Sequence, residues 1–286
     1  MTAIDGRAAV VTGGGHGIGR VLALELARAG AAVAVADIIV DNAELVAAEI
    51  RAAGGRAVAL HCDVCERESI AELKQQAQRA LGPITVLVAN AGATSFQRLT
   101  EMSDADVDWI LQVNLMGTIY CIQAFLPDMI AAGQGGHLVA TASMAGMLPA
   151  WVPLHAPYSA AKLGIIGFML NIGIELADND IKTTTYCPGG VATGLSANNE
   201  RYRPARFGGP GPGPITIPND FIHENMKLLE PESIAPLVVR AIRTDRPLVF
   251  DHAEQLQVWL DTYQRPVLDA FEAIAREHAG DQDSLA

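Results

Sequence analysis

Buried-strand patterns alternate with helical patterns along most of the chain, and this alternation limits the possible folds. The candidate strands are mostly apolar on both faces, and they occupy residues 8–13, 31–37, 56–64, 84–92, 137–143, 181–190 and 247–251. Such strands with helices between them are typical of a parallel sheet covered on both sides. Because crossovers between parallel strands are right-handed, the sequence predicts a doubly wound α/β fold with about seven strands.

Helical patterns fill the intervals between the strands, at residues 18–30, 42–55, 68–82, 104–133, 157–179 and about 231–243. The alternation breaks at 194–230, which is dense in proline and glycine. A loop of this length inside a compact domain is usually a functional flap or a disordered segment. We interpret it as a lid, with a fixed surface loop as the alternative. Since no repeat or linker is visible, we expect one domain over 1–286, with an amphipathic C-terminal helix at 253–279.

Composition and charge argue against several classes of function. The net charge of −12 repels phosphate backbones, so binding of nucleic acid is not expected as a main role. The N-terminus lacks the pattern of a signal peptide, and no stretch reaches ~18 uninterrupted apolar residues, so we expect a soluble, cytoplasmic protein without a membrane partner. The four cysteines form no disulfide-like framework. Cys62 and Cys65 make a lone CxxC, which is weak support for zinc, and we predict no metal site.

The first strand runs into a glycine-rich turn, TGGGHGIG, at residues 12–19. Gly13, Gly17 and Gly19 stand where a strand turns into a helix. Glycine there lets the backbone turn sharply and lets a phosphate approach the helix N-terminus. Glycine-rich turns are weak signals alone, but the position of this turn favours a dinucleotide site.

Polar side chains follow the next strands. Asp37 ends the second strand about 20 residues after the glycines, where a carboxylate accepts hydrogen bonds from the ribose 2′-hydroxyl of adenosine. It would repel a 2′-phosphate, and no Arg or Lys follows directly, so we predict NAD rather than NADP. The alternative is that Asp37 caps the following helix. Asp63, in CDV, is placed to bind the adenine amino group, and Asn90 and Gly92 end the fourth strand at the same crevice.

Further motifs follow in order along the chain: Asn114, Ser143, YSAAK at 158–162 and CPGG at 187–190. Together with the glycine turn and Asp37, they make the chain resemble the short-chain dehydrogenase/reductase family over about residues 5–251. The resemblance implies an NAD(P)-dependent enzyme with a Rossmann-type fold, and a homodimer or homotetramer built on the helix of Tyr158. It also implies a catalytic tetrad, which carries over as Asn114, Ser143, Tyr158 and Lys162.

The resemblance implies a set of cofactor contacts as well. They carry over as Gly13, Gly15, His16, Gly17, Ile18, Gly19, Asp37, Asp63, Val64, Asn90, Ala91, Gly92, Tyr158, Lys162, Pro188, Gly189, Val191 and Thr193. Within this set, Thr193 would contact the nicotinamide carboxamide. The alternative for Thr193 is a cap for the next helix.

The spacing of Tyr158 and Lys162 suits this chemistry, because residues four apart share one face of a helix. A free phenol has a pKa of about 10, and a nearby ammonium lowers that pKa, so Tyr158 is expected to act as general base or acid. Lys162 is also placed to hold ribose hydroxyls. Ser143 is placed to hold the substrate oxygen, and Asn114 to hold a water in a proton relay to Lys162. The alternatives are a solvated Tyr/Lys face, a plain strand-end serine and an asparagine that points outward.

Apolar side chains near these motifs predict a mostly apolar substrate pocket. The candidates are Phe96, Met144, Trp151 and Leu195. We therefore expect an NAD-dependent dehydrogenase of a bulky secondary alcohol, aromatic, alicyclic or steroid-like, or a reductase of the matching ketone. The segment before Ser143 and the proline-rich flap also look like family members that oxidise benzylic alcohols of lignin-type aromatics, or hydroxysteroids. His155 is either close to the substrate or an ordinary loop histidine.

Two other functions stay open at this point. One is an NADPH-dependent reductase of a 3-oxoacyl carrier or another ketone, against which Asp37 argues. The other is a non-catalytic NAD-binding protein on the same fold, since a fold alone does not fix function. The complete tetrad argues against this last interpretation.

Overall fold

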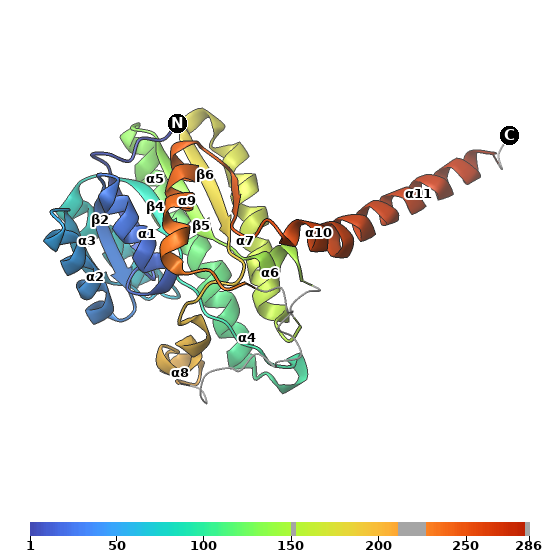
Figure 1. Cartoon of the computed structure of the whole chain (residues 1–286), viewed down its shortest axis with the longest axis horizontal. Coiled ribbons are helices and arrows are strands. Elements are labelled where there is room, and N and C mark those ends of the chain that lie inside the picture. The colour runs from blue at the N-terminus through green and yellow to red at the C-terminus, as the bar shows by residue number, and fades with distance from the viewer. Residues whose placement is uncertain (150–152, 211–226, 284–286) are drawn as a thin grey trace.

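The computed structural model describes residues 1–149, 153–210 and 227–283. Seven parallel strands form one sheet in the order β3-β2-β1-β4-β5-β6-β7 (Figure 1). The strands are β1 Ala8–Thr12, β2 Ala32–Asp37, β3 Ala57–His61, β4 Ile84–Ala89, β5 Gly136–Thr141, β6 Ile181–Cys187 and β7 Leu248–Phe250. The predicted doubly wound fold is therefore confirmed, and each predicted strand overlaps one of these strands.

Helices cover both faces of the sheet (Figure 1). On one face lie α1 Gly17–Arg28, α2 Val40–Ala52 and α9 Pro231–Arg243. On the other face lie α3 Arg67–Leu81, α5 Gly117–Ala132 and α7 Ala156–Glu175. The further helices are α4 Asp104–Leu111, α6 Met144–Met147, α8 Asn198–Arg201, α10 Gln255–Trp259 and α11 Arg265–Asp283. The predicted helices recur among these, with ends that differ by a few residues.

Strand β1 shows why the sheet is buried on both sides. Ala8 and Val10 face the core beneath α3, α5 and α7, while Ala9 and Val11 face the core beneath α1, α2 and α9. Each of these side chains is at most 6% exposed. Fully burying one valine side chain contributes about 1.5–3 kcal/mol. When helices pack on both sides of the sheet, the apolar side chains on each face of the strand make this contribution.

Helix α7 carries Tyr158 and Lys162 on its buried side. The buried positions there include Tyr158, Lys162, Ile165, Ile166, Met169 and Ile172. The helical tract 104–132 and helix α7 are long and apolar enough to cross a membrane by length and composition. Both pack on the sheet, where α5 contacts β4 and α7 contacts β6. Such contacts are typical of the core helices of a soluble domain.

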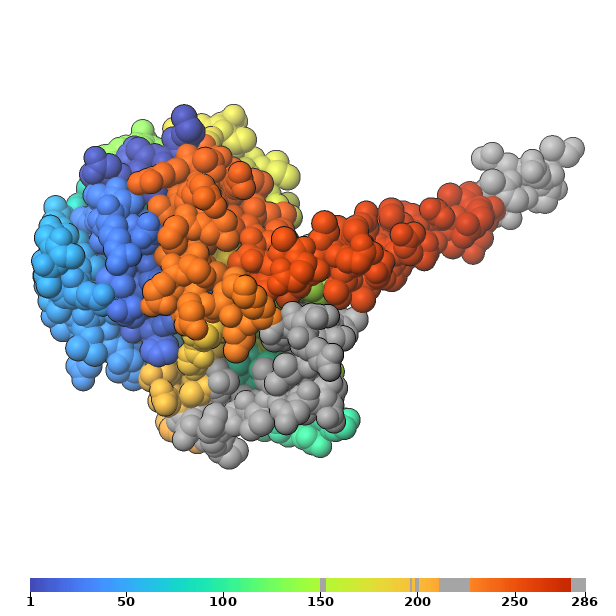
Figure 2. Space-filling view, viewed as in Figure 1, coloured from blue at the N-terminus to red at the C-terminus, as the bar shows by residue number. Residues whose placement is uncertain are grey.

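Helix α11 leaves the body of the molecule (Figure 1), while α10 packs against the core through Val258 and Trp259. A π-helical segment, Leu260–Gln264, joins α10 to α11, and α11 projects away from the sheet (Figure 1, Figure 2). Several of its apolar side chains are exposed: Val267, Leu268, Phe271 and Ile274. The sequence predicts an amphipathic helix here, and the apolar side of α11 has no covering element among the residues that the structure describes.

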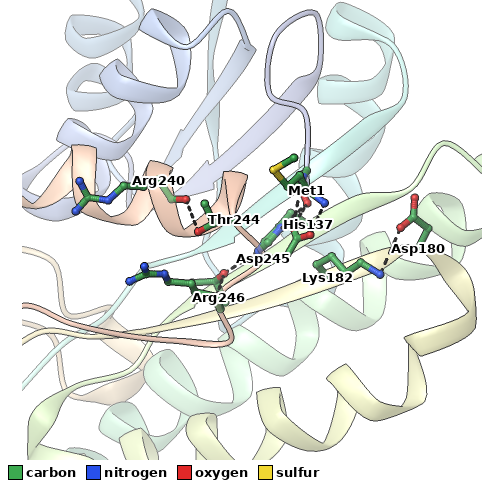
Figure 3. Close-up of polar contacts among 10 residues, drawn as sticks. Met1, His137, Asp180, Lys182, Arg240, Thr244, Asp245 and Arg246 are labelled. Carbon is green, nitrogen blue, oxygen red and sulfur yellow. Dashed lines mark hydrogen bonds and ion pairs between the residues drawn. The ribbon is translucent and has the colours of Figure 1, made fainter.

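A polar network closes the amino-terminal edge of the sheet (Figure 3). The carboxylate of Asp245, between α9 and β7, lies 2.6 Å from the amine of Met1 and accepts from the Thr2 hydroxyl at 2.7 Å. The Thr2 hydroxyl also lies 2.9 Å from Nδ1 of His137, whose Nε2 lies 2.7 Å from the Thr184 hydroxyl. His137 is fully buried in β5, and this burial lowers its pKa to about 4.

The buried imidazole of His137 predicts a stability that depends on pH. Its pKa is about 4 in the folded chain and about 6.5 in the unfolded chain, so the unfolded state binds the proton first as the pH falls. The contribution is fully present above about pH 6.5 and is lost as the pH falls toward 4. Between pH 7.5 and pH 5 we expect a loss of about 2 kcal/mol in the free energy of unfolding.

Urea unfolding at these two pH values measures the loss, and His137→Gln is the matched variant. The variant should lose less stability than the wild type over the same interval, because its side chain does not titrate. An equal loss in both proteins would show that His137 is not the source.

Candidate active site

A cavity of about 170 Å³ lies at the carboxyl ends of the strands, beside β1 and β4. The strand order reverses at this point, because the sheet grows from β1 toward β2 and β3 on one side and from β4 toward β7 on the other. Ligands of open α/β sheets bind at such a switch point. The ends of β1, β2, β4 and β5 and the buried side of α7 all contribute to the lining, so side chains from separate motifs meet in one place.

Most of the predicted site residues line this cavity. They are Gly13, His16, Gly17, Ile18, Asp37, Asp63, Val64, Asn90, Ala91, Gly92, Asn114, Tyr158, Lys162, Pro188, Thr193 and Leu195. Of the remaining catalytic and cofactor candidates, five lie beside these residues in the chain without lining the cavity: Gly15, Gly19, Ser143, Gly189 and Val191. The hydroxyl of Thr193 accepts from the N–H of Leu195 at 3.4 Å, so this residue both lines the cavity and caps the turn that follows it.

The glycine turn after β1 packs directly on the segment after β4. Gly13 and Gly17 have φ angles of 61° and 52°, a region that favours glycine. A Cβ on Gly13 would stand 2.9 Å from Cα of Ala91, and one on Gly19 would stand 2.1 Å from the carbonyl oxygen of Gly13. His16, the N-cap of α1, makes no side-chain cap bond within the described ranges. The first N–H groups of α1 are therefore available to an anionic group.

Asn90 ties three strand ends together. Its backbone N–H donates to the hydroxyl of Thr12 at 3.0 Å, and its side-chain amide donates to the carbonyl of Thr12 at 3.2 Å. Its side-chain oxygen accepts from the Thr141 hydroxyl at 3.0 Å. These bonds join β1, β4 and β5 at the floor of the cavity, so Asn90 holds the strand ends in register as well as lining the site.

Asp37 ends β2 at the cavity and is 9% exposed. Its Oδ2 accepts from the N–H of Gly15 at 2.9 Å, and its Oδ1 accepts from the N–H of Ile39 at 3.0 Å. Burial raises the pKa of Asp37, and these hydrogen bonds oppose the rise. The N-cap of α2 is Ile39, so Asp37 does not cap that helix as the alternative interpretation suggests. Each carboxylate oxygen keeps a lone pair for the hydroxyls of a ribose.

Asp63 contacts a residue of the flap. Its Oδ2 lies 2.7 Å from the guanidinium of Arg206, which also lies 3.0 Å from Glu66. Its Oδ1 accepts from the N–H of Cys65 at 2.9 Å. The sequence predicts an adenine amino group as the partner of Asp63. In this structure the guanidinium of Arg206 donates to one of the two carboxylate oxygens of Asp63.

Arg203 anchors the flap to α4. Its guanidinium pairs with Asp106 in the first turn of α4 and lies 5.7 Å from the ring centroid of Trp109. The side chains of Arg203 and Asp106 are only 7% and 17% exposed. This pair therefore links two segments that are far apart in the sequence inside a largely dry contact.

The two ends of the flap 194–230 lie side by side. Val191 and Leu229 form a parallel bridge, in which the N–H of Ala192 donates to the carbonyl of Leu229 at 2.9 Å. Tyr202, within the flap, lines the cavity. Residues 211–226 of the predicted lid lie outside the described residues.

Tyr158 and Lys162 face the cavity from α7 and are 6% and 2% exposed. The Lys162 nitrogen lies 5.3 Å from the centroid of the Tyr158 ring. It donates to the carbonyl oxygen of Thr141, at the end of β5, at 2.8 Å. The pair is buried in the cleft, which excludes the alternative of a solvated helix face.

The protonation of this pair differs from the expectation. Burial raises the pKa of Tyr158 to about 12, and a hydrogen bond with Ser143 works in the opposite direction. Burial also lowers the pKa of Lys162 to about 7. The prediction of a phenol acidified by its neighbour is therefore wrong for the folded chain by itself, because desolvation of Tyr158 outweighs the opposing hydrogen bond with Ser143. An amine with a pKa near neutrality is still well suited to exchange protons.

Asn114 lies in a distortion of its helix. Gln112–Met116 form a π-helical segment between α4 and α5, a feature that is frequent at functional sites. The Asn114 amide donates to the carbonyls of Ala93 and Ile110 at 2.8 Å each. The Thr118 hydroxyl donates to the backbone carbonyl of Asn114 at 2.8 Å. Asn114 is fully buried, so the alternative of an outward-pointing side chain is wrong.

Ser143 follows β5 and begins α6. Its hydroxyl accepts from the N–H of Ala145 at 3.1 Å and donates to the carbonyl of Pro188 at 3.5 Å. It is 8% exposed. The serine therefore caps a short helix and also joins the strand end to the CPGG turn after β6.

The candidate substrate residues fall in different places. Leu195 lines the cavity, and Phe96 stacks on His155. Met144 is 5% exposed and packs in the core beneath α7, which differs from the predicted position facing a substrate. Trp151 lies outside the described residues.

The sequence does not predict several residues of the cavity. They are Ile38, Asn42, Cys62, Ala93, Trp109, Val113, Thr141, Ala142, Asn198 and Pro204. Asn198 donates to the carbonyl of Gly92 at 2.9 Å, and no motif in the sequence marks it. Trp109 lies five residues before Asn114 on the same helical tract, and that proximity is the one sequence signal for it.

A second unpredicted group supports the turn after β6. Asp251 accepts from the N–H of Gly189 at 2.9 Å and from the Tyr186 hydroxyl at 2.6 Å. His252 donates to Asp251 at 2.6 Å and to the carbonyl of Lys227 at 2.7 Å. Both partners are able to accept, so a protonated imidazole would satisfy both bonds. Burial disfavours that charge, but the hydrogen bonds outweigh burial and raise the pKa of His252.

The residues present fit a nicotinamide dinucleotide. The close packing at Gly13 leaves room only for backbone, the first turn of α1 offers N–H donors, and the buried Asp37 offers an acceptor. Gly17 and Thr193 adjoin on the far side of the turn, where a Cβ on Gly17 would stand 3.3 Å from Thr193. Among the described residues, no group of three or more His, Cys, Asp or Glu side chains is arranged to hold a metal ion.

Comparisons with known proteins agree with this geometry. The family described as short chain dehydrogenase matches residues 7–203, which include the glycine turn, Asp37, Tyr158 and Lys162. The C alpha-dehydrogenase of Sphingobium sp. (strain NBRC 103272 / SYK-6) is 29% identical over 94% of this chain and 88% of its own length. The 3-oxoacyl acyl-carrier-protein reductase of Synechocystis sp. is 35% identical over 69% of this chain and 79% of its own length.

A solved structure shows the same fold. A short chain dehydrogenase/reductase from Burkholderia phymatum, crystallised in complex with NAD, superposes with a TM-score of 0.84 at 27% sequence identity. The superposition covers 94% of this chain and 97% of that one. The likeness therefore extends beyond the matched family segment to nearly the whole chain.

Proposed function

The chain belongs to the short-chain dehydrogenase/reductase family, and we propose that it is an NAD-dependent dehydrogenase of bulky, apolar secondary alcohols, or a reductase of the matching ketones. The observation that carries this proposal is a buried tyrosine and lysine in one cavity with a glycine turn. Tyr158 and Lys162 lie one helical turn apart on α7 and face the strand end where the glycine turn begins. That arrangement puts a group able to move a hydroxyl proton beside a site for a dinucleotide.

Asp37 supports NAD over NADP. Its buried carboxylate at the end of β2 is suited to accept from ribose hydroxyls, and it would repel a 2′-phosphate. The residues that follow, Ile38 and Ile39, offer no cation to such a phosphate. We infer that the glycine turn and the N-terminus of α1 hold the pyrophosphate, and that Pro188 and Thr193 contact the nicotinamide end.

A bound nicotinamide would take the hydride from the alcohol carbon, or return it to the ketone. Tyr158 would take the hydroxyl proton during oxidation and give it back during reduction. Ser143, bonded to the Pro188 carbonyl, would hold the substrate oxygen beside Tyr158. Lys162, with a pKa of about 7, would pass the proton on toward the distorted helix at Asn114, where a water would bridge the remaining gap.

The lining of the cavity supports an apolar substrate. Trp109, Val113 and Leu195 present apolar surface to it, and Tyr202 adds an aromatic ring from the flap. The net charge of −12 also disfavours anionic substrates such as sugar phosphates. Pockets of this kind bind ligands mainly through apolar contact, with a few polar groups for orientation.

We further propose that the chain forms one domain over 1–286 and that the flap 194–230 acts as a lid. The ion pairs of Arg203 with Asp106 and of Arg206 with Asp63 support the lid. Exposed apolar side chains on the outer side of α7 support a homodimer or homotetramer built on that helix; they are Leu163, Leu170 and Ile174. Four free cysteines are consistent with a cytoplasmic location.

An NADPH-dependent reductase of a 3-oxoacyl substrate, or of another ketone, is the second candidate. The likeness to the Synechocystis 3-oxoacyl reductase favours it. Asp37 disfavours NADPH, while Tyr158 and Lys162 are compatible with both candidates. A non-catalytic NAD-binding protein is the third candidate, and measured turnover would eliminate it.

Tyr158→Phe tests the reaction class. The variant loses the hydroxyl that moves the proton but keeps the buried ring, so we expect kcat to fall by about 100- to 10,000-fold with unchanged affinity for NAD. Absorbance of reduced nicotinamide measures kcat, and calorimetry measures the Kd for NAD. Tyr263→Phe, whose ring stacks on Trp259 away from the cavity, is the control. Full turnover by Tyr158→Phe would contradict the assignment.

Asp37→Ala tests the cofactor. Loss of the carboxylate removes acceptors for ribose and removes the repulsion of a 2′-phosphate, so the preference for NAD over NADP should fall by about tenfold or more. Kd values for both dinucleotides measure the preference. Asp41→Ala, at an exposed position in the first turn of α2, is the control and should change neither value. An unchanged preference in Asp37→Ala would mean that another group selects the cofactor.

A panel of secondary alcohols with NAD tests the substrate class. Aryl, alicyclic and steroid alcohols should be oxidised with higher kcat/KM than small or anionic alcohols, because the cavity offers apolar contact. Absorbance of the reduced nicotinamide follows each reaction. Oxidation of sugar phosphates, with none of the bulky alcohols oxidised, would refute the proposed substrate class.

A further inference from the structure

His155 lies in the turn that leads into α7, and its side chain is 5% exposed. The imidazole centroid lies 4.2 Å from the centroid of the Tyr158 ring, with the planes at 10°. It also lies 4.2 Å from the centroid of the Phe96 ring, with the planes at 23°. Two rings this close cannot share one face of the imidazole. His155 is therefore held between Phe96 and Tyr158.

The backbone of the turn places the imidazole in this stack. Leu154 has a φ of 61°, which is uncommon for a residue with a side chain. Its carbonyl accepts from the N–H of Gln97 at 2.9 Å, which ties the turn to the segment after β4. The carbonyl of His155 accepts from the N–H of Ser159 at 2.9 Å in the first turn of α7. Both ends of the short turn are thus fixed by backbone hydrogen bonds.

A hydrogen bond sets the rotation of the imidazole within the stack. Nε2 of His155 bonds to the hydroxyl of Thr94, which is 2% exposed. Nδ1 has no hydrogen-bond partner among the described residues. With both faces covered and one nitrogen bonded, the ring cannot rotate without losing that bond in a buried place.

The imidazole is uncharged in this position. Burial, with a smaller effect of the nearby Lys162 charge, lowers the pKa of His155 to about 3. An imidazolium against the Tyr158 ring would favour the phenolate and would repel Lys162. The neutral ring instead contributes packing without charge, and the proton stays with Tyr158 and Lys162.

Tyr158 stands in the first turn of α7, so its ring has no preceding turn of that helix to pack on and stacks on His155 instead. Its hydroxyl must come within about 2.6–3.2 Å of the substrate oxygen to move a proton. We propose that His155 is a positioning residue for Tyr158, which it holds in the reactive orientation by stacking between that tyrosine and Phe96. The proposal deepens the proposed function, on which it rests, by adding a residue that acts through Tyr158.

Two substitutions distinguish the effect of ring stacking from the other roles that His155 could have. His155→Leu keeps a similar volume and removes the ring, whereas His155→Phe keeps a ring that is able to stack. With 1-phenylethanol and NAD, we expect kcat of His155→Leu to fall by about 10- to 100-fold, with KM and the Kd for NAD nearly unchanged. His155→Phe should return kcat to within about threefold of the wild type. His278→Leu, at an exposed position on α11, is the control and should match the wild type.

The pH profile of kcat gives a further readout. Loss of the stack lets water reach the phenol, so the acid limb of His155→Leu should move to lower pH, while that of His155→Phe stays in place. Equal losses of kcat in the two variants would overturn the proposal, because the imidazole nitrogens and not the stack would then matter. A wild-type kcat in His155→Leu, or a parallel loss of NAD affinity and melting temperature, would overturn it as well.

A measurement without turnover separates this proposal from the proposed function. NMR of the chain with ¹³C-labelled tyrosine rings, assigned through Tyr158→Phe, reports the ring directly. The ring of residue 155 stacked on Tyr158 should shift the Tyr158 resonances upfield in the wild type and in His155→Phe, but not in His155→Leu. No such shift in the wild type would overturn the stack. If the Tyr158 resonances showed the upfield shift but the protein reduced NAD with none of the alcohols, the stack would be supported and the proposed function refuted.

Discussion

A parallel strand that is buried on both faces presents polar groups mainly at its ends, and the candidate site follows from that constraint. Thr12, Asp37 and Thr141 are each the last residue of a strand, and Asn90 follows directly after β4. All of them reach the same edge because the strands are parallel. The opposite edge collects polar groups too, but there they bond to one another around Asp245 and hold the fold. One edge is therefore closed by its own hydrogen bonds, while the other faces a cavity.

The flap depends on two ion pairs of different character. Arg203 and Asp106 are largely buried, so breaking the pair would leave a charge that is poorly solvated. Arg206 and Glu66 are 39% and 47% exposed, and exposed pairs contribute only about 0–1 kcal/mol each. The contact at Arg203 is thus the firmer anchor. Arg206 also donates to Asp63, which lines the cavity, so movement of the flap would alter the hydrogen-bonding capacity of that carboxylate.

Local patterns in the sequence predict the strands, the helices and most of the cavity lining, because periodicity and turn residues are set by near neighbours. Such local patterns do not predict contacts between distant segments. Arg203 and Asp106 stand 97 residues apart, and no motif near either residue indicates that the two form a pair. The burial of His155 depends on Phe96 and Tyr158 closing on it from two segments. The error about the acidity of Tyr158 has the same origin. The sequence shows a phenol and an ammonium one turn apart, but only the packing of α7 on the sheet shows how little water reaches them.

That burial changes the electrostatic character of the cleft. Desolvation raises the pKa of Tyr158 and lowers the pKa of Lys162 and His155, so all three groups are driven toward their neutral forms. Because the buried cleft contains little water, it screens a newly formed charge only weakly. If Tyr158 lost its proton, the negative charge of the phenolate would therefore favour the protonated form of Lys162. The same burial that makes the phenol a weak acid alone would therefore strengthen the interaction between a phenolate at Tyr158 and an ammonium at Lys162.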